Sequence, residues 1–181
     1  MEKDRNALTY EGLAGKFSDS PARQGRAVFS MLFILTNRLQ TLFDRHIPDI
    51  SLKQFMLLSV IRQTSGPKTL TEMGTFLGCS RQNVKKLAEV LERKGFVAMS
   101  RNPKDPRATL LAPTEKADRF FREDFRKYQD ELQELFTVYS ADQLQELLWL
   151  LTRLFEGVDR LEKLTEQNQV RSQEKEKGNG I

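Results

Sequence analysis

The sequence of 181 residues contains only one cysteine, one histidine and one tryptophan. A lone cysteine, Cys79, cannot form an internal disulfide, which is typical of proteins from a reducing compartment and predicts a cytoplasmic location. Cys79 and His46 are too few to supply the ligands of a zinc site, and a single histidine leaves no credible catalytic triad. A glycine-rich phosphate loop is also missing. We therefore expect neither an enzyme nor a bound cofactor.

Long hydrophobic runs are absent as well. The first twenty residues lack the apolar stretch of a signal peptide. The longest apolar stretch, residues 27–35, is far shorter than the roughly 20 residues that span a bilayer. We expect a soluble protein of about one domain with no membrane partner.

Charge is unevenly distributed along the chain. Between Arg62 and Arg107 there are ten basic and four acidic residues, a net charge of +6. Between Thr114 and Glu156 there are six basic and ten acidic residues, a net charge of −4. A basic region beside an acidic one is typical of a DNA-binding face. Ordinary solvated helices also carry such runs, so charge alone does not decide between the two.

Helix boundaries can be located between residues 51 and 78. Ser51 with Gln54, and Thr69 with Glu72, have the capping-box spacing that begins a helix. The first of these helices is expected to end near residue 63, and the second at Gly78. The helix that ends at Gly78 is expected to be the first of a helix-turn-helix pair, with its turn at residues 77–80.

A third helix is expected to begin after Ser80 and to end at Lys94-Gly95. Its apolar residues have the spacing of one buried face: Val84, Leu87, Ala88 and Leu91. The opposite face carries the long polar side chains suited to base edges and phosphates in a major groove: Arg81, Gln82, Lys85 and Lys86. Ser80 and the first amides of this helix are expected to hold a phosphate.

Two short apolar segments, residues 96–100 and 109–112, flank a tip at residues 102–106 and predict a β-hairpin wing. Its charged residues are Arg101, Lys104, Asp105 and Arg107. An arginine on a thin hairpin can enter a minor groove, and Asp105 could orient the Arg107 guanidinium or hold the hairpin. The alternative is a solvated tip held by a local ion pair.

Long amphipathic helices are expected on both sides of this region, at residues 21–45, 114–139 and 141–163. The first and last carry heptad-type apolar stripes at Val28, Leu32, Leu35, Leu39, Leu42, and at Leu147, Leu151, Leu154, Val158, Leu161. Such stripes favour a homodimer, although packing against the chain's own winged domain is an alternative. Residues 1–20 are expected to form a flexible arm and residues 165–181 a disordered tail.

The fold class expected is therefore mainly α, a winged helix-turn-helix with a small β wing at residues 50–113. Long helices at residues 21–49 and 114–164 would form the dimerisation region on either side of it.

Residues 69–97, TLTEMGTFLGCSRQNVKKLAEVLERKGFV, resemble the multiple-antibiotic-resistance regulator (MarR) family of bacterial transcription factors. The resemblance continues through the D-x-R tip, Asp105-Pro106-Arg107, to Thr114-Glu115-Lys116. The chain departs from the family's usual Leu-Thr-x-Lys-Gly at residues 113–117, which read PTEKA. The resemblance implies an obligate homodimer that places the helix from Ser80 in the major groove and Arg107, supported by Asp105, in the minor groove.

The function expected is a sequence-specific regulator that binds double-stranded DNA, and specifically a homodimeric repressor on a pseudo-palindromic operator. Its DNA-binding residues would be Ser80, Arg81, Gln82, Lys85, Lys86, Arg101, Lys104, Asp105 and Arg107. The principal alternative is a winged-helix module that binds protein, which would need an apolar exposed face on the helix after Ser80.

Two further hypotheses concern regulation. Family members take aromatic effectors between the dimer helices and the winged domain, and Phe29, Phe33 and Phe55 are candidates for such a site. Aromatic residues at helical spacing are more often ordinary core. Cys79, beside a helix N-cap, is a candidate redox sensor. The alternative is a purely structural role as a small buried residue in the turn.

Overall fold

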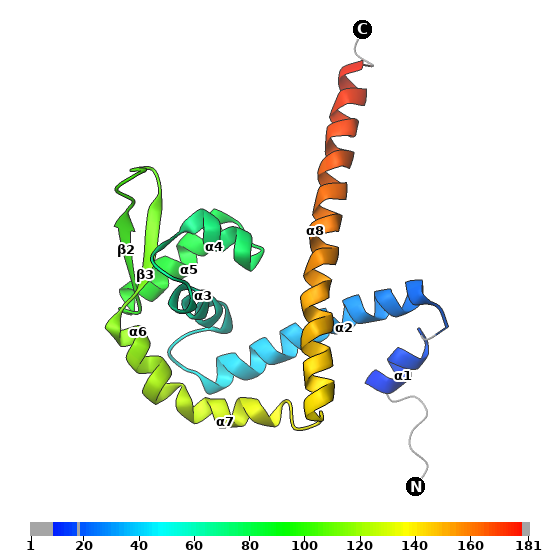
Figure 1. Cartoon of the computed structure of the whole chain (residues 1–181), viewed down its shortest axis with the longest axis horizontal. Helices are drawn as coiled ribbons and strands as arrows, with labels where there is room; N and C mark the ends of the chain where they lie inside the picture. Colours follow the sequence, from blue (N-terminus) through cyan, green and yellow to red (C-terminus); the bar gives the residue numbers. More distant parts are fainter. Residues whose placement is uncertain (1–8, 18, 179–181) are drawn as a thin grey trace. The chain divides into compact units, whose positions relative to one another are not determined.

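The computed structural model describes residues 9–17 and 19–178. The chain divides into two compact units, Met1–Phe125 and Arg126–Ile181, and each is considered by itself. Figure 1 shows the order of the elements along the chain. In the described part no helix is long and apolar enough to cross a membrane.

The centre of the first unit is a cluster of three helices, α3 (Leu52–Gln63), α4 (Leu70–Leu77) and α5 (Arg81–Arg93). Both predicted capping boxes are present, at the start of α3 and of α4. The backbone N–H and the hydroxyl of Thr69 donate to the Glu72 carboxylate, and these bonds, the backbone bond first, hold the pKa of Glu72 below its ordinary value. Gly78 ends α4 in the left-handed conformation, as expected, with φ of 65°.

A three-stranded antiparallel sheet flanks these helices. Strands β2 (Val97–Arg101) and β3 (Thr109–Pro113) form the predicted wing. A third strand, β1 (Lys68–Thr69), pairs with β3 so that the order is β1-β3-β2. The sequence did not predict β1, because two residues are too few to show the alternation of a strand.

The core of the first unit lies where α3, α4, α5 and β3 meet. Apolar side chains from all four elements are fully buried there: Leu57, Leu58, Ile61, Leu70, Val84, Leu91 and Leu111. The predicted stripe of α5 is buried at Val84, Ala88 and Leu91 and half-buried at Leu87. Its opposite face is therefore left toward solvent.

The expected continuous helix over residues 114–139 is interrupted, and this prediction was wrong. It consists of α6 (Glu115–Arg119), the π-helical turn η1 (Phe120–Asp124) and α7 (Arg126–Glu134). In η1 the Phe125 N–H donates to the Phe120 carbonyl, five residues back, at 2.8 Å. The wider turn buries Phe120 and Phe125 together, with ring centroids 6.1 Å apart.

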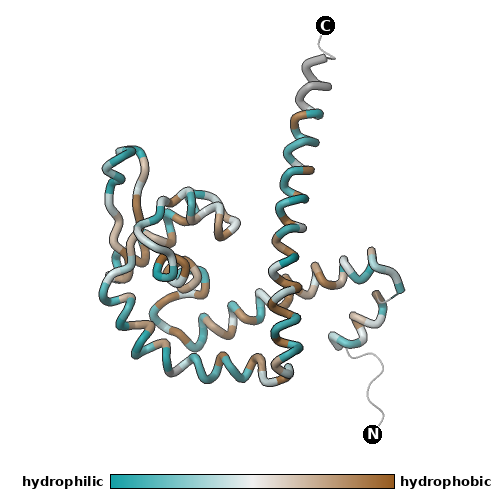
Figure 2. The backbone as a smooth tube through the Cα atoms, in the orientation of Figure 1, coloured by the Kyte–Doolittle hydropathy of each residue, from teal (hydrophilic) through white to brown (hydrophobic). Residues whose placement is uncertain are grey.

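The second unit contains α7 and the 38-residue helix α8 (Ala141–Gly178). The predicted capping box is present before α8, where the Ser140 hydroxyl accepts the Gln143 N–H at 3.2 Å. The disordered tail expected at residues 165–181 is not seen over residues 165–178, which belong to α8, and residues 179–181 lie outside the described residues. Figure 2 shows that apolar positions are frequent in the first part of α8 and sparse toward its end.

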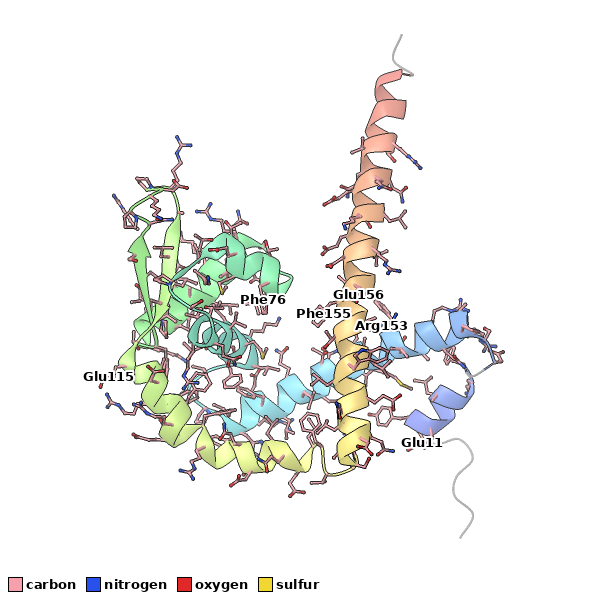
Figure 3. All side chains as sticks on the ribbon, viewed as in Figure 1. Glu11, Phe76, Glu115, Arg153, Phe155 and Glu156 are labelled. Carbon is pink, nitrogen blue, oxygen red and sulfur yellow. The ribbon has the colours of Figure 1, made fainter. Side chains whose placement is uncertain are left out.

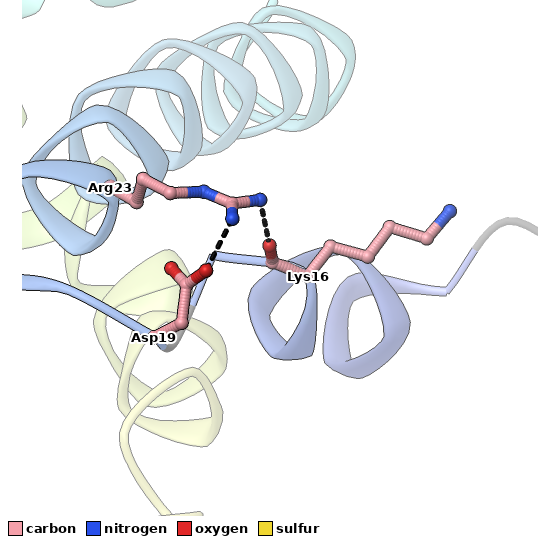
Figure 4. A network of polar contacts seen from close by, with 3 residues as sticks. All are labelled: Lys16, Asp19 and Arg23. Atoms are coloured by element: carbon pink, nitrogen blue, oxygen red, sulfur yellow. Dashed lines mark hydrogen bonds and ion pairs between the residues drawn. The ribbon is translucent and has the colours of Figure 1, made fainter.

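The N-terminal part of the first unit contains α1 (Tyr10–Gly15) and α2 (Pro21–His46). Helix α2 has nearly the predicted bounds, whereas α1 lies within the flexible arm that we expected at residues 1–20, of which residues 1–8 and 18 lie outside the described residues. Arg38 of α2 donates to the Tyr10 hydroxyl at 2.7 Å, and Arg23 donates to the Asp19 carboxylate and to the Lys16 carbonyl (Figure 4). These two arginines tie the segment before α2 to that helix.

Candidate nucleic-acid interface

Helix α5 is the candidate recognition helix. It begins after Ser80, whose hydroxyl accepts the Asn83 N–H at 3.2 Å. Its first two turns expose four of the predicted DNA-binding side chains, Arg81, Gln82, Lys85 and Lys86. Lys85 also lies 3.6 Å from the Glu89 carboxylate, a weak exposed pair. The exposed first turns are thus basic, and the apolar face is in the core.

The turn between α4 and α5 depends on a close backbone approach that we had not predicted. The Cys79 N–H donates to the Gly74 carbonyl at 2.9 Å. A Cβ atom on Gly74 would lie 2.7 Å from the Cys79 carbonyl oxygen. Only glycine therefore fits at position 74 without a backbone shift. Cys79 itself is half-buried and has a structural place in this turn.

The wing tip is closed by hydrogen bonds from backbone amides to Asp105. The Asp105 carboxylate accepts the Arg107 N–H at 3.0 Å, and the Asp105 carbonyl accepts the Ala108 N–H at 2.9 Å. Among the described residues no ion pair joins Asp105 to the Arg107 guanidinium. Asp105 thus holds the hairpin, the second of the two roles considered for it. The side chains of Arg101, Lys104 and Arg107 are exposed.

Two hydrogen bonds join the recognition helix to the wing. The Arg81 guanidinium, in the first turn of α5, lies 3.5 Å from the Arg107 carbonyl oxygen, at the outer limit of a hydrogen bond. The Glu92 carboxylate, in the last turn, accepts the Met99 N–H of β2 at 3.0 Å. These contacts hold together the two parts that would enter the two grooves. No sequence signal indicated Glu92, because its partner is a backbone amide.

The three aromatic residues proposed for an effector site are not brought together in the structure. Phe29 and Phe33 form an exposed edge-to-face pair on α2, with ring centroids 4.9 Å apart. Phe55 instead packs on Phe43 and Phe125, at 4.9 and 4.5 Å. The first two remain candidates for a binding surface, while Phe55 belongs to an aromatic cluster of the first unit.

Residues 50–109, from the residue before the α3 cap to the first residue of β3, match the model of the MarR family. Within this segment the chain is similar to the MarR family. The chain is 28% identical over 92 residues to the transcriptional repressor MprA of Escherichia coli, covering 51% of this chain and 52% of that protein. The chain thus spans about half the length of the curated relatives it matches.

Solved structures have the same fold as this chain. A mutant MarR from E. coli complexed with operator DNA matches with a TM-score of 0.64 at 22% identity, covering 75% of this chain and 99% of that one. The PcaV transcriptional regulator from Streptomyces coelicolor, in complex with its natural ligand, matches with a TM-score of 0.57 at 18% identity, covering 77% and 94%. The predicted winged helix-turn-helix with a small wing is confirmed.

Proposed function

We propose that this protein is a homodimeric transcriptional repressor that binds a pseudo-palindromic site in double-stranded DNA. The observation that carries the proposal is the arrangement of α5 and the wing. Four long polar side chains project from the first two turns of a helix whose other face is in the core, and an arginine-bearing hairpin is hydrogen-bonded to that helix. A major groove admits one such helix, and a minor groove admits an arginine.

Each predicted residue would have a defined role. Arg81 and Gln82 are placed to read base edges, because arginine suits guanine and glutamine suits adenine. Lys85 and Lys86 would contact guanine or phosphate, and Ser80 with the first amides of α5 would hold a phosphate. On the wing, Arg107 would enter the minor groove. Arg101 and Lys104 would lie near the DNA phosphate backbone, and Asp105 would fix the conformation of the tip.

The dimer part of the proposal is supported by apolar stripes that remain uncovered. Helix α2 has no buried residue, and Val28, Leu35 and Leu42 on its stripe are about half exposed. On α8 the stripe residues Leu151, Leu154 and Val158 are 40–45% exposed. Phe155 is 70% exposed on the same helix (Figure 3). Burial of one such side chain contributes roughly 1.5–3 kcal/mol of favourable free energy. Association with a second copy that buries these stripes would therefore be strongly favoured.

Repression is supported by similarity to MprA, which is named a transcriptional repressor. An aromatic effector is the finer part of the proposal, since PcaV is described in complex with its natural ligand. The exposed Phe29–Phe33 pair would supply one apolar wall for it.

Two alternative functions have less support. The contacts of Cys79 do not favour a redox role. A protein-binding role for α5 would need an apolar face where Arg81, Lys85 and Lys86 are exposed.

Selection from random duplex DNA tests this function. The full chain is mixed with a pool of random duplexes at moderate salt, and the retained fraction is amplified and sequenced. We expect an inverted repeat whose half-sites are centred about one helical turn, roughly 34 Å, apart. A pool that shows no enriched motif after repeated rounds would contradict sequence-specific binding. Enrichment of a single half-site would contradict the dimer.

A further inference from the structure

A pocket of about 590 Å³ lies in the first unit at the C-terminal end of α5. Its size is within the range of about 300–1,000 Å³ that is usual for small-molecule sites. Its lining includes Arg93 and Lys94, the last residue of α5 and the residue after it, together with Lys116 and Arg119 of α6. The pocket is separate in residues and in chemistry from the Phe29–Phe33 pair.

The charge of this pocket is positive. It has four cationic side chains and two carboxylates, those of Asp49 and Asp124, which leaves a net charge of +2. The guanidinium groups of Arg93 and Arg119 have no hydrogen-bond or ion-pair partner among the described residues. Planar guanidinium forks match the oxygens of carboxylate and phosphate groups, so both arginines are available to an anion.

The two lysines are held in place at the same pocket. The Lys116 ammonium donates to the Lys94 carbonyl at 2.7 Å, which satisfies one carbonyl at the end of α5. The Lys94 ammonium in turn donates to the Asp49 carbonyl. Each ammonium has three N–H donors, and one is used in each of these contacts. The remaining donors can serve a ligand without loss of the helix cap.

Two aromatic residues also line the pocket. Phe96 and Phe120 are each only 3% exposed and meet edge to face, with ring centroids 5.4 Å apart. The Lys116 ammonium lies 4.7 Å from the Phe96 ring centroid. An apolar wall lowers the local dielectric constant and strengthens the attraction between the cations and an anion. Both rings line the pocket, and only a small part of each is exposed to an apolar part of the ligand.

We propose that this pocket binds a small phosphate monoester, with the phosphate between Arg93 and Arg119 and its organic part against Phe96 and Phe120. A phosphate monoester carries a charge near −2 at neutral pH, which balances the net charge of the pocket. The volume exceeds that of phosphate alone, which is why an organic part is included. A ligand at this place would contact the C-terminal end of α5, the proposed recognition helix. An effect of the ligand on DNA binding would depend on the proposed function, whereas the binding of the ligand itself does not.

Calorimetric titration of the full chain with phenyl phosphate, in the absence of DNA, tests the site. We expect saturable binding at one ligand per chain, and binding of benzoate weaker by about tenfold or more, because benzoate has half the charge and fewer acceptor oxygens. The double variant Arg93→Gln with Arg119→Gln should lose about tenfold or more in affinity. A matched control, Arg122→Gln with Arg126→Gln, removes two exposed arginines that do not line the pocket.

Three results would overturn the proposal: no saturable binding of phenyl phosphate, binding of benzoate with equal affinity, or equal losses in the pocket variant and in the control. Circular dichroism of both variants checks that they are folded. Because no DNA is present, a failure here leaves the proposed DNA binding untouched. Selection of a DNA motif by a chain that does not bind phenyl phosphate would separate the two claims.

Discussion

The carboxylate of Asp105 accepts the backbone N–H of Arg107, with the oxygen 3.0 Å from the nitrogen. This bond forms an Asx-type turn at the tip of the wing. The acid thus fixes the backbone that carries the arginine and does not pair with its guanidinium in the described structure. The side chain that we expect in the minor groove is aimed from a fixed position and remains available to DNA.

Replacement of Arg107 by alanine should weaken DNA binding by about 1–3 kcal/mol, the range for one good groove contact. The fold should be unchanged, because the hydrogen bonds described here for Arg107 use its backbone N–H and carbonyl. Anisotropy titration at fixed salt measures the affinity, and circular dichroism checks the fold. An affinity equal to that of the unaltered chain would count against a wing in the minor groove.

Two substitutions at Asp105 separate its geometry from its charge. Asp105→Asn and Asp105→Ala both remove the negative charge, but only asparagine keeps an oxygen that can accept the Arg107 N–H. We expect the asparagine variant to bind DNA more tightly than the alanine variant. Equal affinities for the two would show that the turn at the tip does not matter for binding.

The bond between Glu92 and the Met99 N–H can be tested by hydrogen exchange. Glu92→Gln keeps an acceptor oxygen for the amide, whereas Glu92→Ala removes it. The Met99 amide should exchange faster in the alanine variant and near the original rate in the glutamine variant, because β2 is an edge strand and Glu92 supplies its partner. DNA affinity should fall in the same order. Unchanged exchange at Met99 in both variants would contradict the contact.

Charges placed in the α8 stripe should break the proposed dimer. Leu151→Glu with Leu154→Glu introduces two carboxylates where a partner helix is expected, and burial of unpaired charge is costly. The matched control, Gln145→Glu with Thr152→Glu, adds the same charge to another face of α8 by helical spacing. Analytical ultracentrifugation at micromolar concentration should show a monomer for the first variant and a dimer for the second. A folded dimer of the stripe variant would contradict the interface.

Much of the first unit could be predicted from sequence because its helix ends depend on local chemistry. Ser51, Thr69 and Ser80 cap helices by bonds to residues three positions along the chain, and Gly78 adopts the left-handed conformation that a helix end requires. Such contacts are readable from spacing alone. The buried side of α5 followed from its 3.6-residue periodicity for the same reason.

The helix after the wing could not be predicted in detail, because its irregularity depends on tertiary packing. Phe120 and Phe125 are five residues apart, which does not place them on one face of an α-helix, yet both are buried. The π-helical turn brings them to one side, where Phe125 packs on Phe55. A periodicity analysis that assumes α-helical spacing misses this arrangement.

The tail was misjudged for a different reason. Its lack of apolar residues was taken as a sign of disorder, but residues 165–177 contain no proline or glycine and are rich in glutamine, glutamate, lysine and arginine. These residues favour helix, and extension of a helix that already exists is far easier than its nucleation. Low hydrophobicity therefore indicated only that the end of α8 contributes little to a core.

The most direct test of the central claim is the salt dependence of binding to a selected duplex. The logarithm of the affinity should fall linearly with the logarithm of salt concentration, and each phosphate contact should contribute about 0.9 to the slope. Lys85→Gln with Lys86→Gln should flatten the slope by about 0.9 for each lysine that meets a phosphate and should relax sequence preference where a lysine reads a base. A double variant with the original slope and the original preference would show that this face of α5 does not meet DNA.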